Sequence, residues 1–357
     1  PDEIYHAVII ATWNEAREIL QPTLENVKNS LYDKSKMIVL LAYEDRGGEA
    51  VEKQAKKLMA EYEGVFYISK ATKHIDQPGE VIGKGGNITA AGRELLKIVK
   101  KEGIDPKNVL VTTLDSDNRP HEKYFSNLAY VYSVIHDPKY MSFQPLPMFT
   151  NNIWDAPAPM RVIATGNSFW MLVQGLRQHM LRNFSAHAQP LHGLIETDFW
   201  TVRSIVEDGH QFWRSYFAFH GKHEVIPIFL PIYQDAVMAK GYARTMKAQF
   251  IQLRRWAYGA SDISYVAKFG FFTKNMIPKR DVWFKFLRLF EGHVSWATSP
   301  LILLFGAIIP WLFNQDSFLA NQLPQLSSRI QTLALVGILV TMFISFRILP
   351  PKPARYN

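Results

Sequence analysis

Short apolar runs alternate with helical patterns over the first 115 residues, and this alternation limits the fold more than any other feature. The runs cover 7–12, 37–42, 65–68 and 109–114, and the segments between them repeat apolar residues at helical spacing. Strands joined by helices of this length form βαβ units and a parallel sheet. The sequence therefore predicts an α/β fold with its ligand site at the carboxyl edge of the strands.

Two carboxylates, Asp115 and Asp117, follow the fourth apolar run directly. Oxygen ligands of this kind suit Mg²⁺ or Mn²⁺, and a cation held by few carboxylates usually carries substrate phosphates as well. A solvated turn after a strand is the alternative for this pair taken alone. The pair gains weight because a second acidic pair, Glu207 and Asp208, follows further along the chain.

Two other motifs carry groups that can bind anions. Lys84 stands among glycines at 83–86, just before a predicted helix at 88–100, but without the spacing of a P-loop. This segment is either a flexible loop or a place for a diphosphate at a helix N-terminus. Gln252, Arg255 and Trp256 fall on one face of a long helix predicted from residue 242. They form either an ordinary amphipathic face or a platform for an anionic sugar ligand.

Two uncharged runs near the C-terminus, 294–313 and 330–346, are each close to the length needed to cross a bilayer. A buried helical hairpin is the alternative. An amphipathic segment at 279–293 precedes them and predicts an interfacial helix. Basic residues flank the two runs on the outside, whereas the loop between them holds one. The positive-inside rule then places the large N-terminal part in the cytoplasm. The flanking basic residues are Lys279, Arg280, Lys285, Arg288, Arg347, Lys352 and Arg355, and the loop residue is Arg329.

The net charge of +8 is compatible with nucleic acid, an anionic membrane or phosphorylated substrates as partners. No nucleic-acid recognition motif accompanies it, and much of the charge flanks apolar runs. The chain has no cysteine, which excludes disulfides, thiolate metal sites and a cysteine nucleophile.

Together these motifs resemble the membrane-integrated family 2 glycosyltransferases, which include cellulose, chitin and hyaluronan synthases and glucosylceramide synthase. The resemblance covers about residues 5 to 313. The matching segments, in chain order, are Thr12-Trp13-Asn14-Glu15, Glu44-Asp45, Lys84-Gly85-Gly86-Asn87, Asp115-Ser116-Asp117, Val206-Glu207-Asp208 and Gln252 to Trp256. Valine replaces the usual threonine before Glu207, and Glu44-Asp45-Arg46 departs from the common Asp-Asp-Gly pattern. These departures bear most on recognition of the donor base.

The resemblance implies a role for each matched residue. Asp115 and Asp117 would hold Mn²⁺ or Mg²⁺, with Asp208 as the catalytic base and Glu207 beside it. Gly166 and Asn167 would lie in an acceptor-side loop. The donor-binding set would be Thr12, Glu15, Glu44, Asp45, Lys84, Asp115 and Arg255, and the acceptor pocket would add Gln252 and Trp256.

The resemblance also implies an architecture and an activity. A mostly parallel, Rossmann-like GT-A domain would occupy residues 1–278, followed by the interfacial helix at 279–293 and a transmembrane hairpin at 294–357, with spans near 294–313 and 330–349. The activity would be inverting transfer of a sugar from a UDP-sugar, or alternatively a GDP-sugar, to a membrane lipid or growing glycan. The protein would be a multi-pass membrane protein with a cytoplasmic catalytic domain, in the plasma membrane if it is prokaryotic.

Three other hypotheses stay open at this stage. The enzyme could be a processive polysaccharide synthase, although two spans are few for a translocating channel in a monomer, which favours a lipid acceptor, a short product or a homo-oligomer. A catalytically silent, glycosyltransferase-like membrane scaffold belongs to a different class, and the presence of Asp115, Asp117 and Asp208 weighs against it. Generic nucleic-acid binding rests on the basic charge alone.

Overall fold

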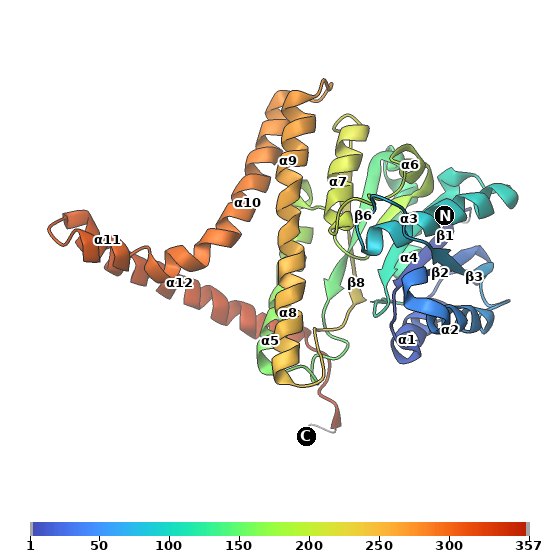
Figure 1. Cartoon of the computed structure of the whole chain (residues 1–357), viewed down its shortest axis with the longest axis horizontal. Coiled ribbons are helices and arrows are strands. Elements are labelled where there is room, and N and C mark those ends of the chain that lie inside the picture. Colours follow the sequence, from blue (N-terminus) through green and yellow to red (C-terminus); the bar gives the residue numbers. More distant parts are fainter. Residues whose placement is uncertain (1–2, 355–357) are drawn as a thin grey trace. The chain divides into compact units, whose positions relative to one another are not determined.

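The alternating pattern folds into one eight-stranded mixed sheet in the computed structural model, which describes residues 3–354 (Figure 1). Residues 1, 2 and 355–357, including Arg355 of the predicted basic flank, lie outside the described residues. The chain divides into two compact units, one ending at Gly259 and the other beginning at Ala260. The sheet belongs to the first unit, and the α/β class predicted for it is confirmed.

The strand order is β3-β2-β1-β4-β7-β6-β8-β5. Strands β1 to β4 pair in parallel, as the helical connections between them require, whereas the short β7 pairs antiparallel to both β4 and β6. The strands are β1 (Tyr5–Thr12), β2 (Met37–Glu44), β3 (Ile68–His74), β4 (Val109–Asp115), β5 (Arg119–Pro120), β6 (Met141–Met148), β7 (Ala188–Pro190) and β8 (Glu224–Tyr233).

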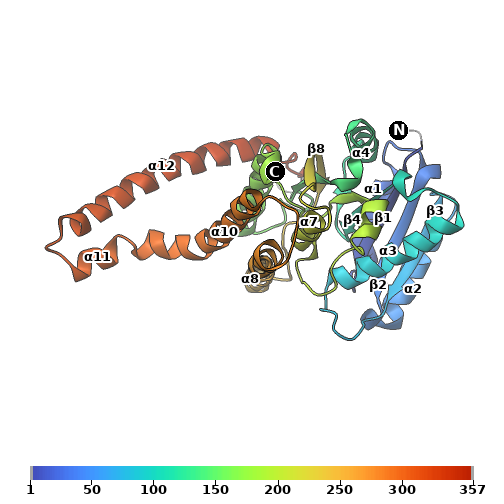
Figure 2. The same cartoon turned by 90° about the horizontal axis from the view of Figure 1, so that it is seen from above.

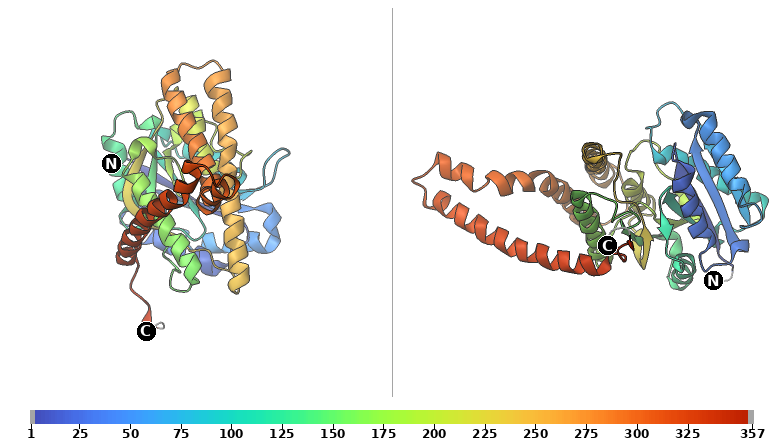
Figure 3. Two further views of the ribbon diagram at one scale, coloured as in Figure 1. Left: turned by 90° about the vertical axis from the view of Figure 1, so that its left-hand side faces the viewer. Right: turned by 90° about the horizontal axis from the view of Figure 1, so that it is seen from below.

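Helices cover both faces of this sheet, as Figures 2 and 3 show from further directions. Val8 and Ile10 of β1 point to one face, where α1, α2 and α4 supply buried side chains, and Ile9 points to the other, where α3 packs. The helices of this unit are α1 (Arg17–Lys28), α2 (Gly48–Ala60), α3 (Lys84–Lys101), α4 (Tyr124–Val134), α5 (Ala158–Gly175), α6 (Leu191–Glu196), α7 (Glu207–Ala218) and α8 (Tyr242–Ala257). Because both faces are covered, β2 is buried along its whole length, and its sequence is apolar from Met37 to Tyr43.

Strand β3 lies three residues further along than the predicted run at 65–68. It forms the outer edge of the sheet and alternates half-buried with exposed residues, including Lys70 and Lys73. A strand of this kind carries no continuous apolar run, because an edge strand has one neighbour in the sheet and is covered less completely than a central strand. The sequence pattern therefore marked the turn before the strand rather than the strand itself.

Helix α5 corrects the predicted placement of Gly166 and Asn167, which lie inside this helix and not in a loop. The helix begins at Ala158 and ends at Gly175. Its buried residues recur at helical spacing through the segment that reads as a proline-rich loop: Met160, Ala164, Ser168, Met171 and Gly175. Pro157 immediately precedes the first turn, where its fixed φ suits the start of a helix.

The second unit contains α9 (Ser261–Ala267), a π-helical turn at Lys268–Phe272, α10 (Lys279–Phe305), α11 (Ile308–Phe313) and α12 (Phe318–Ile348). The segment predicted as a separate interfacial helix, 279–293, continues without a break to Phe305, because no helix-stopping residue stands at 293. The predicted span 294–313 is instead divided near Gly306 between α10 and α11. The predicted second span lies within α12.

Among residues 3–354, one helix, α12, is long and apolar enough to cross a membrane, and no second spanning helix accompanies it. Its 31 residues extend about 46 Å at the rise of an α-helix. Pro300 inside α10 and the interruption at Gly306 shorten the continuous apolar helix that the uncharged run had predicted. The predicted pair of spans is therefore reduced to one candidate.

Candidate active site

Four parallel strands bring their carboxyl ends to the same edge of the sheet. The register pairs Ala11 with Asp115 and Glu44 with His74, so the ends of β1 to β4 lie side by side. Several of the residues predicted to bind the donor stand at this edge, since Thr12, Glu44 and Asp115 are the last residues of β1, β2 and β4. The sheet therefore assembles the predicted donor residues from distant parts of the sequence.

Lys84 and Asp115 form an ion pair at the centre of this edge. The Lys84 Nζ lies 2.7 Å from Asp115 Oδ1, and the two side chains are 18% and 39% exposed. Burial by itself would lower the pKa of Lys84, but Asp115, Glu207 and Asp208 together raise it. Burial likewise opposes ionisation of Asp115, yet Lys84, the Ser185 hydroxyl and Arg255 hold the pKa of this carboxyl below its ordinary value.

Helix α3 carries Lys84 at its start, and the two residues that follow in its first turn, Gly85 and Gly86, have no side chain. Lys84 is the first residue of α3, so of the two alternatives for this segment the structure has the helix N-terminus, with the helix beginning four residues before the predicted 88. A Cβ on Gly85 would lie 2.3 Å from the carbonyl oxygen of Thr201, and one on Gly86 would lie 2.7 Å from His74. The two glycines therefore allow the helix to approach its neighbours closely, a packing requirement that also explains the motif.

Glu207 and Asp208 begin α7 and face the same cluster. Burial raises the pKa of Glu207, and the neighbouring Asp208 raises it further, while Lys84 opposes both effects. Burial also raises the pKa of Asp208, against the backbone N–H of Gly209, which donates to Asp208 Oδ1 at 2.7 Å. Two crowded, buried carboxyl groups near a lysine provide a group that can accept a proton near neutral pH.

Asp117 lies in a more acidic environment than Asp115. Burial, Asp115 and Asp235 raise the pKa of Asp117 to about 7, although the backbone N–H of Asp235 donates to Asp117 Oδ2 at 2.9 Å. Asn151 donates its Nδ2 to the Asp117 carbonyl oxygen at 2.9 Å and so fixes the loop. One buried oxygen of Asp235, Oδ1, has no hydrogen-bond partner in the described structure.

These carboxylates fit a divalent cation by their chemistry. Asp115, Asp117 and Asp235 offer only oxygen ligands, which Mg²⁺ and Mn²⁺ prefer, and their mutual repulsion would be relieved by a cation. A second group of possible ligands, Glu44, His74 and Asp76, has its ligand atoms within 4.8 Å of one another at the ends of β2 and β3. In this group Arg46 already pairs with Glu44, and His74 Nε2 lies 3.0 Å from Glu80.

Glu15, one of the residues predicted to bind the sugar donor, instead stabilises the loop that follows β1. Glu15 Oε2 accepts hydrogen bonds from the Thr12 hydroxyl at 2.7 Å and from the Trp13 backbone N–H at 2.8 Å. The Arg46 guanidinium lies over the Trp13 ring, 4.9 Å from its centre. Thr12 and Glu15 thus shape this loop, while Asp45 pairs with Lys73 at 2.7 Å and is half exposed.

Arg255 on α8 completes the cluster from far along the chain. Its positive charge favours the ionised form of Asp115 and of Asp208, although burial still raises the pKa of Asp208. On the same helix, Gln252 Oε1 accepts a hydrogen bond from Gln249 at 3.1 Å, and Trp256 is half-buried. Among the described contacts, an electrostatic effect on the cluster is recorded for Arg255 and none for Gln252 or Trp256.

Sequence reasoning missed Ser185 and Asp235. The Ser185 hydroxyl donates to Asp115 Oδ2 at 2.5 Å from a loop 70 residues away, and nothing in its local pattern marks it. Asp235 had a usable signal, because it follows an extended run just as Asp115 does. Strand β8 ends at Tyr233, two residues before Asp235.

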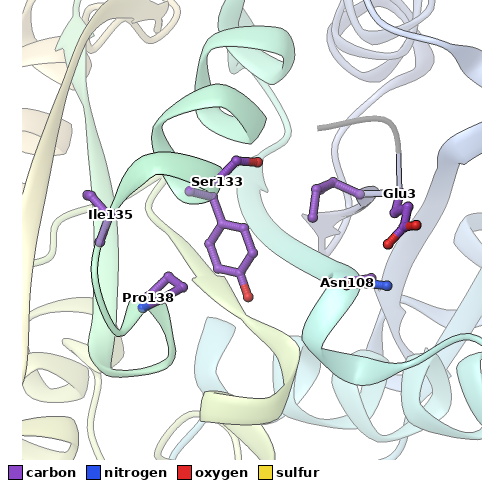
Figure 4. A pocket seen from close by; sticks show the side chains of 7 residues that line it. Glu3, Asn108, Ser133, Ile135 and Pro138 are labelled. Carbon is purple, nitrogen blue, oxygen red and sulfur yellow. The ribbon is translucent and has the colours of Figure 1, made fainter.

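A separate open pocket of about 590 Å³ lies at the opposite edge of the sheet (Figure 4). Glu3 lies two residues before β1 and Asn108 lies directly before β4. Both line the pocket together with Ser133, Ile135 and Pro138. The carboxyl edge, and not this pocket, holds the charged side chains described above.

Comparison with solved structures shows which fold this arrangement belongs to. The chain is similar to S. aureus TarS 1–349 in complex with UDP-GlcNAc, with a TM-score of 0.53 and 12% identity over 85% of this chain and 76% of that one. It is also similar to the mannosyltransferase PcManGT from Pyrobaculum calidifontis in complex with GDP-Man and Mn²⁺, with a TM-score of 0.57 and 13% identity over 95% of this chain and 85% of that one. No family model and no curated protein matches the sequence. The shared feature is thus the fold, which in both structures holds a nucleotide-diphosphate sugar.

Proposed function

We propose that this protein is a metal-dependent, inverting glycosyltransferase that moves a sugar from a nucleotide-diphosphate sugar to a membrane lipid or a growing glycan. The observation that carries the proposal is the cluster of Lys84, Asp115, Asp208 and Arg255 at the carboxyl edge. The two basic side chains suit a bound diphosphate. The carboxylates suit its metal ion and, in Asp208, a proton acceptor. The nucleotide-sugar complexes of the two similar structures support this reading.

The metal site of this proposal consists of Asp115 and Asp117, with Asp235 beside them. A bound Mn²⁺ or Mg²⁺ would neutralise negative charge that develops on the departing nucleotide diphosphate. Lys84 and Arg255 add two fixed positive charges on the protein side. These residues bind and orient the donor, with Glu44, Asp45, Thr12 and Glu15 shaping the region at the ends of β1 and β2.

Asp208 accepts the proton of the acceptor hydroxyl as the oxygen attacks the anomeric carbon. The bond from that carbon to the diphosphate oxygen breaks in the same step, so a single displacement inverts the configuration. Burial raises the pKa of Asp208 toward the range in which a carboxylate is an effective base near neutral pH. Glu207 adjoins it and contributes to this shift through the shared charge of the pair.

The acceptor side of the proposal places Gln252 and Trp256 near the sugar, with Gly166 and Asn167 on α5 as outer positions. A lipid acceptor is favoured because α12 is apolar enough to cross a membrane, which would keep the enzyme at a bilayer surface. In this arrangement the first unit lies in the cytoplasm, consistent with the basic residues that flank the apolar segment.

The test is release of nucleotide from a panel of UDP- and GDP-sugars by the detergent-purified chain, with and without Mn²⁺. Asp208→Asn should lower kcat by about 10² to 10⁴-fold, the usual contribution of a general base. Glu49→Gln, whose side chain is 93% exposed on α2, is the matched control and should turn over normally. Equal rates in Asp208→Asn and wild type would remove the base assignment. Absence of donor binding and turnover in wild type with membrane lipids present would favour the silent scaffold.

A further inference from the structure

The last residues of β2 and β3 stand beside each other in the outer part of the carboxyl edge. The strand register pairs Glu44 with His74, and Asp76 follows two residues after β3 ends. One possible ligand atom from each of these three residues lies within 4.8 Å of the other two. We call the three residues the histidine site. They come from β2, β3 and the loop after β3, whereas Asp115 and Asp117 stand at the end of β4.

One ring nitrogen of His74 is buried without a hydrogen-bond partner. The His74 side chain is 6% exposed, and its Nε2 lies 3.0 Å from Glu80 Oε2. The backbone N–H of Gln77 donates to the same oxygen at 3.0 Å and holds the carboxylate in place. The other ring nitrogen, Nδ1, makes no hydrogen bond to any residue that the structure describes, and Asp76 Oδ1 lies 3.7 Å from it. A buried polar atom of this kind costs free energy unless a ligand satisfies it.

The surroundings of His74 are those of a metal-binding histidine. A histidine that binds a metal through one ring nitrogen usually donates its other N–H to a carboxylate, which fixes the tautomer and the orientation of the ring. Glu80 stands in the place of this carboxylate. Its hydrogen bond assigns the proton of the neutral ring to Nε2, so Nδ1 carries a lone pair. This lone pair is the one that the histidine site offers to a ligand.

The distances in the histidine site suit a zinc ion. Zn²⁺ lies about 2.0–2.2 Å from histidine nitrogen and carboxylate oxygen, so neighbouring ligand atoms of a tetrahedral site are about 3.3–3.6 Å apart. The 3.7 Å between His74 Nδ1 and Asp76 Oδ1 is close to this separation. Glu44 lies within 4.8 Å of both and needs only a small rotation of its side chain. Three protein ligands leave a fourth position for water.

The charges around the histidine site also suit a divalent cation. Glu44, Asp76 and Glu80 supply three negative charges, and Arg46, which donates to Glu44 Oε2, supplies one positive charge. The balance of two negative charges equals the charge of one divalent ion. The Glu44 side chain is 5% exposed, whereas that of Asp76 is 45% exposed. The site is therefore enclosed by protein on the Glu44 side and can be reached from solvent past Asp76.

We propose that Glu44, His74 and Asp76 bind a zinc-type divalent cation, separate from the ion proposed for Asp115 and Asp117. Imidazole together with carboxylate suits Zn²⁺, whereas oxygen ligands alone suit Mg²⁺ and Mn²⁺. This inference goes beyond the proposed sugar transfer and does not depend on it. The two sites take different metals because only one of them contains a nitrogen ligand.

The histidine site adjoins the first turn of α3. A Cβ on Gly86 would lie 2.7 Å from His74 Cε1 and 3.4 Å from Glu80 Oε2, so the backbone of this turn packs directly on the His74–Glu80 pair. Lys84 stands two residues earlier in the same turn. A cation that fixes the His74 ring therefore also fixes the surface on which the start of α3 rests.

Cobalt provides a direct test, because Co²⁺ in a four-coordinate site absorbs visible light strongly, whereas six-coordinate Co²⁺ among oxygen ligands absorbs weakly. The full chain is purified in detergent without a histidine tag, stripped of metal with a chelator and titrated with Co²⁺ and then with Zn²⁺. We expect a strong absorption band with Co²⁺ that Zn²⁺ removes. Asp117→Asn should keep this band, because Asp117 belongs to the other proposed metal site.

Variants of the histidine site separate its ligands from its support. His74→Gln and Asp76→Asn should abolish the Co²⁺ band, and the exposure of Asp76 makes its variant the safer one for folding, which circular dichroism checks. Glu80→Gln should weaken Zn²⁺ binding about 10–100-fold, the usual effect of losing the carboxylate behind a ligating histidine. The control is His136→Gln, because His136 Nδ1 also lies near a carboxylate, 3.3 Å from Asp137 Oδ2, but the ring is 94% exposed. This variant should keep the band.

Three results would overturn the proposal: no band in the wild-type chain, a band that survives in folded Asp76→Asn, or a band that disappears in Asp117→Asn. The last of these would assign the bound ion to the other site. Sugar transfer by a chain that gives no Co²⁺ band would refute the histidine site and leave the proposed function in place. A band that depends on His74 and Asp76, in a chain that transfers no sugar, would refute the proposed function and leave the histidine site in place.

Discussion

The ion pair between Lys84 and Asp115 provides the most direct test of the site, through a double-mutant cycle of Lys84→Met, Asp115→Asn and the combined variant. Unit charges at the 2.7 Å separation of the two atoms interact by about 1.5 kcal/mol in bulk water and by about 6 kcal/mol at an effective dielectric constant near 20. Asp115 is 39% exposed, so solvent screening reduces the larger figure substantially. We expect a coupling energy of about 2 kcal/mol.

The pH dependence of this coupling follows from the two pKa shifts. The pKa of Asp115 is lowered from 3.8, so its contribution to stability is present above that value and is lost as the pH falls through the folded pKa. The pKa of Lys84 is raised from 10.5, so its contribution is present below that value and is lost as the pH rises through the folded pKa. The coupling should therefore be the same at pH 6 and pH 9.

The assay is urea unfolding of the detergent-purified protein, followed by tryptophan fluorescence, which reports on the first unit through the buried Trp200 and Trp213. The control cycle uses Lys56 and Glu52 on α2, which are 2.5 Å apart, and the 63% exposure of Lys56, against 18% for Lys84, should give a smaller coupling. A coupling below about 0.5 kcal/mol for Lys84 and Asp115, or one no larger than the control, would refute the electrostatic account of the site.

Three further predictions concern stability and packing. Glu207→Gln should raise the thermal unfolding temperature of the metal-free protein at pH 9 and change it little at pH 5. The reason is that a carboxyl group whose pKa is raised by burial destabilises the fold once it is ionised. A larger gain in unfolding temperature at pH 5 than at pH 9 would contradict this. The buried Nδ2 of Asn87 donates to the carbonyl oxygens of Thr12 and Ala42, at 3.2 and 2.8 Å. Asn87→Leu should therefore lower the free energy of unfolding in urea by about 1–3 kcal/mol for each carbonyl it leaves unpaired. An unchanged free energy of unfolding would mean that water replaces the amide. Gly85→Ala should abolish donor binding, measured by calorimetry, because the added Cβ would lie 2.3 Å from a backbone oxygen. Gly83→Ala is the control and should bind the donor normally, because a Cβ there meets nothing within 4 Å. Equal binding by both variants would show that the close approach is dispensable.

The parallel half of the fold could be predicted from the sequence because its signals are local. Strands β1, β2 and β4 are buried on both faces, so their apolar runs are continuous and end at the residues where the ligand edge begins. Asp115 and Asp117 could be identified for the same reason. The periodicity failed at the edge strand β3, which carries exposed lysines, and at α5, which follows a proline-rich segment.

The sequence by itself determined which residue types stand at the ends of these elements: two aspartates at the end of β4, a lysine at the start of α3 and an acidic pair at the start of α7. Only the tertiary structure decided which of them meet. Ser185 reaches Asp115 across 70 residues, and Asp235 reaches Asp117 across 118, through loops whose paths have no periodicity to read. It also decided that α8 turns Thr245 inward and Phe250 outward, because the orientation of a helix is fixed by what packs against it and not by its own pattern.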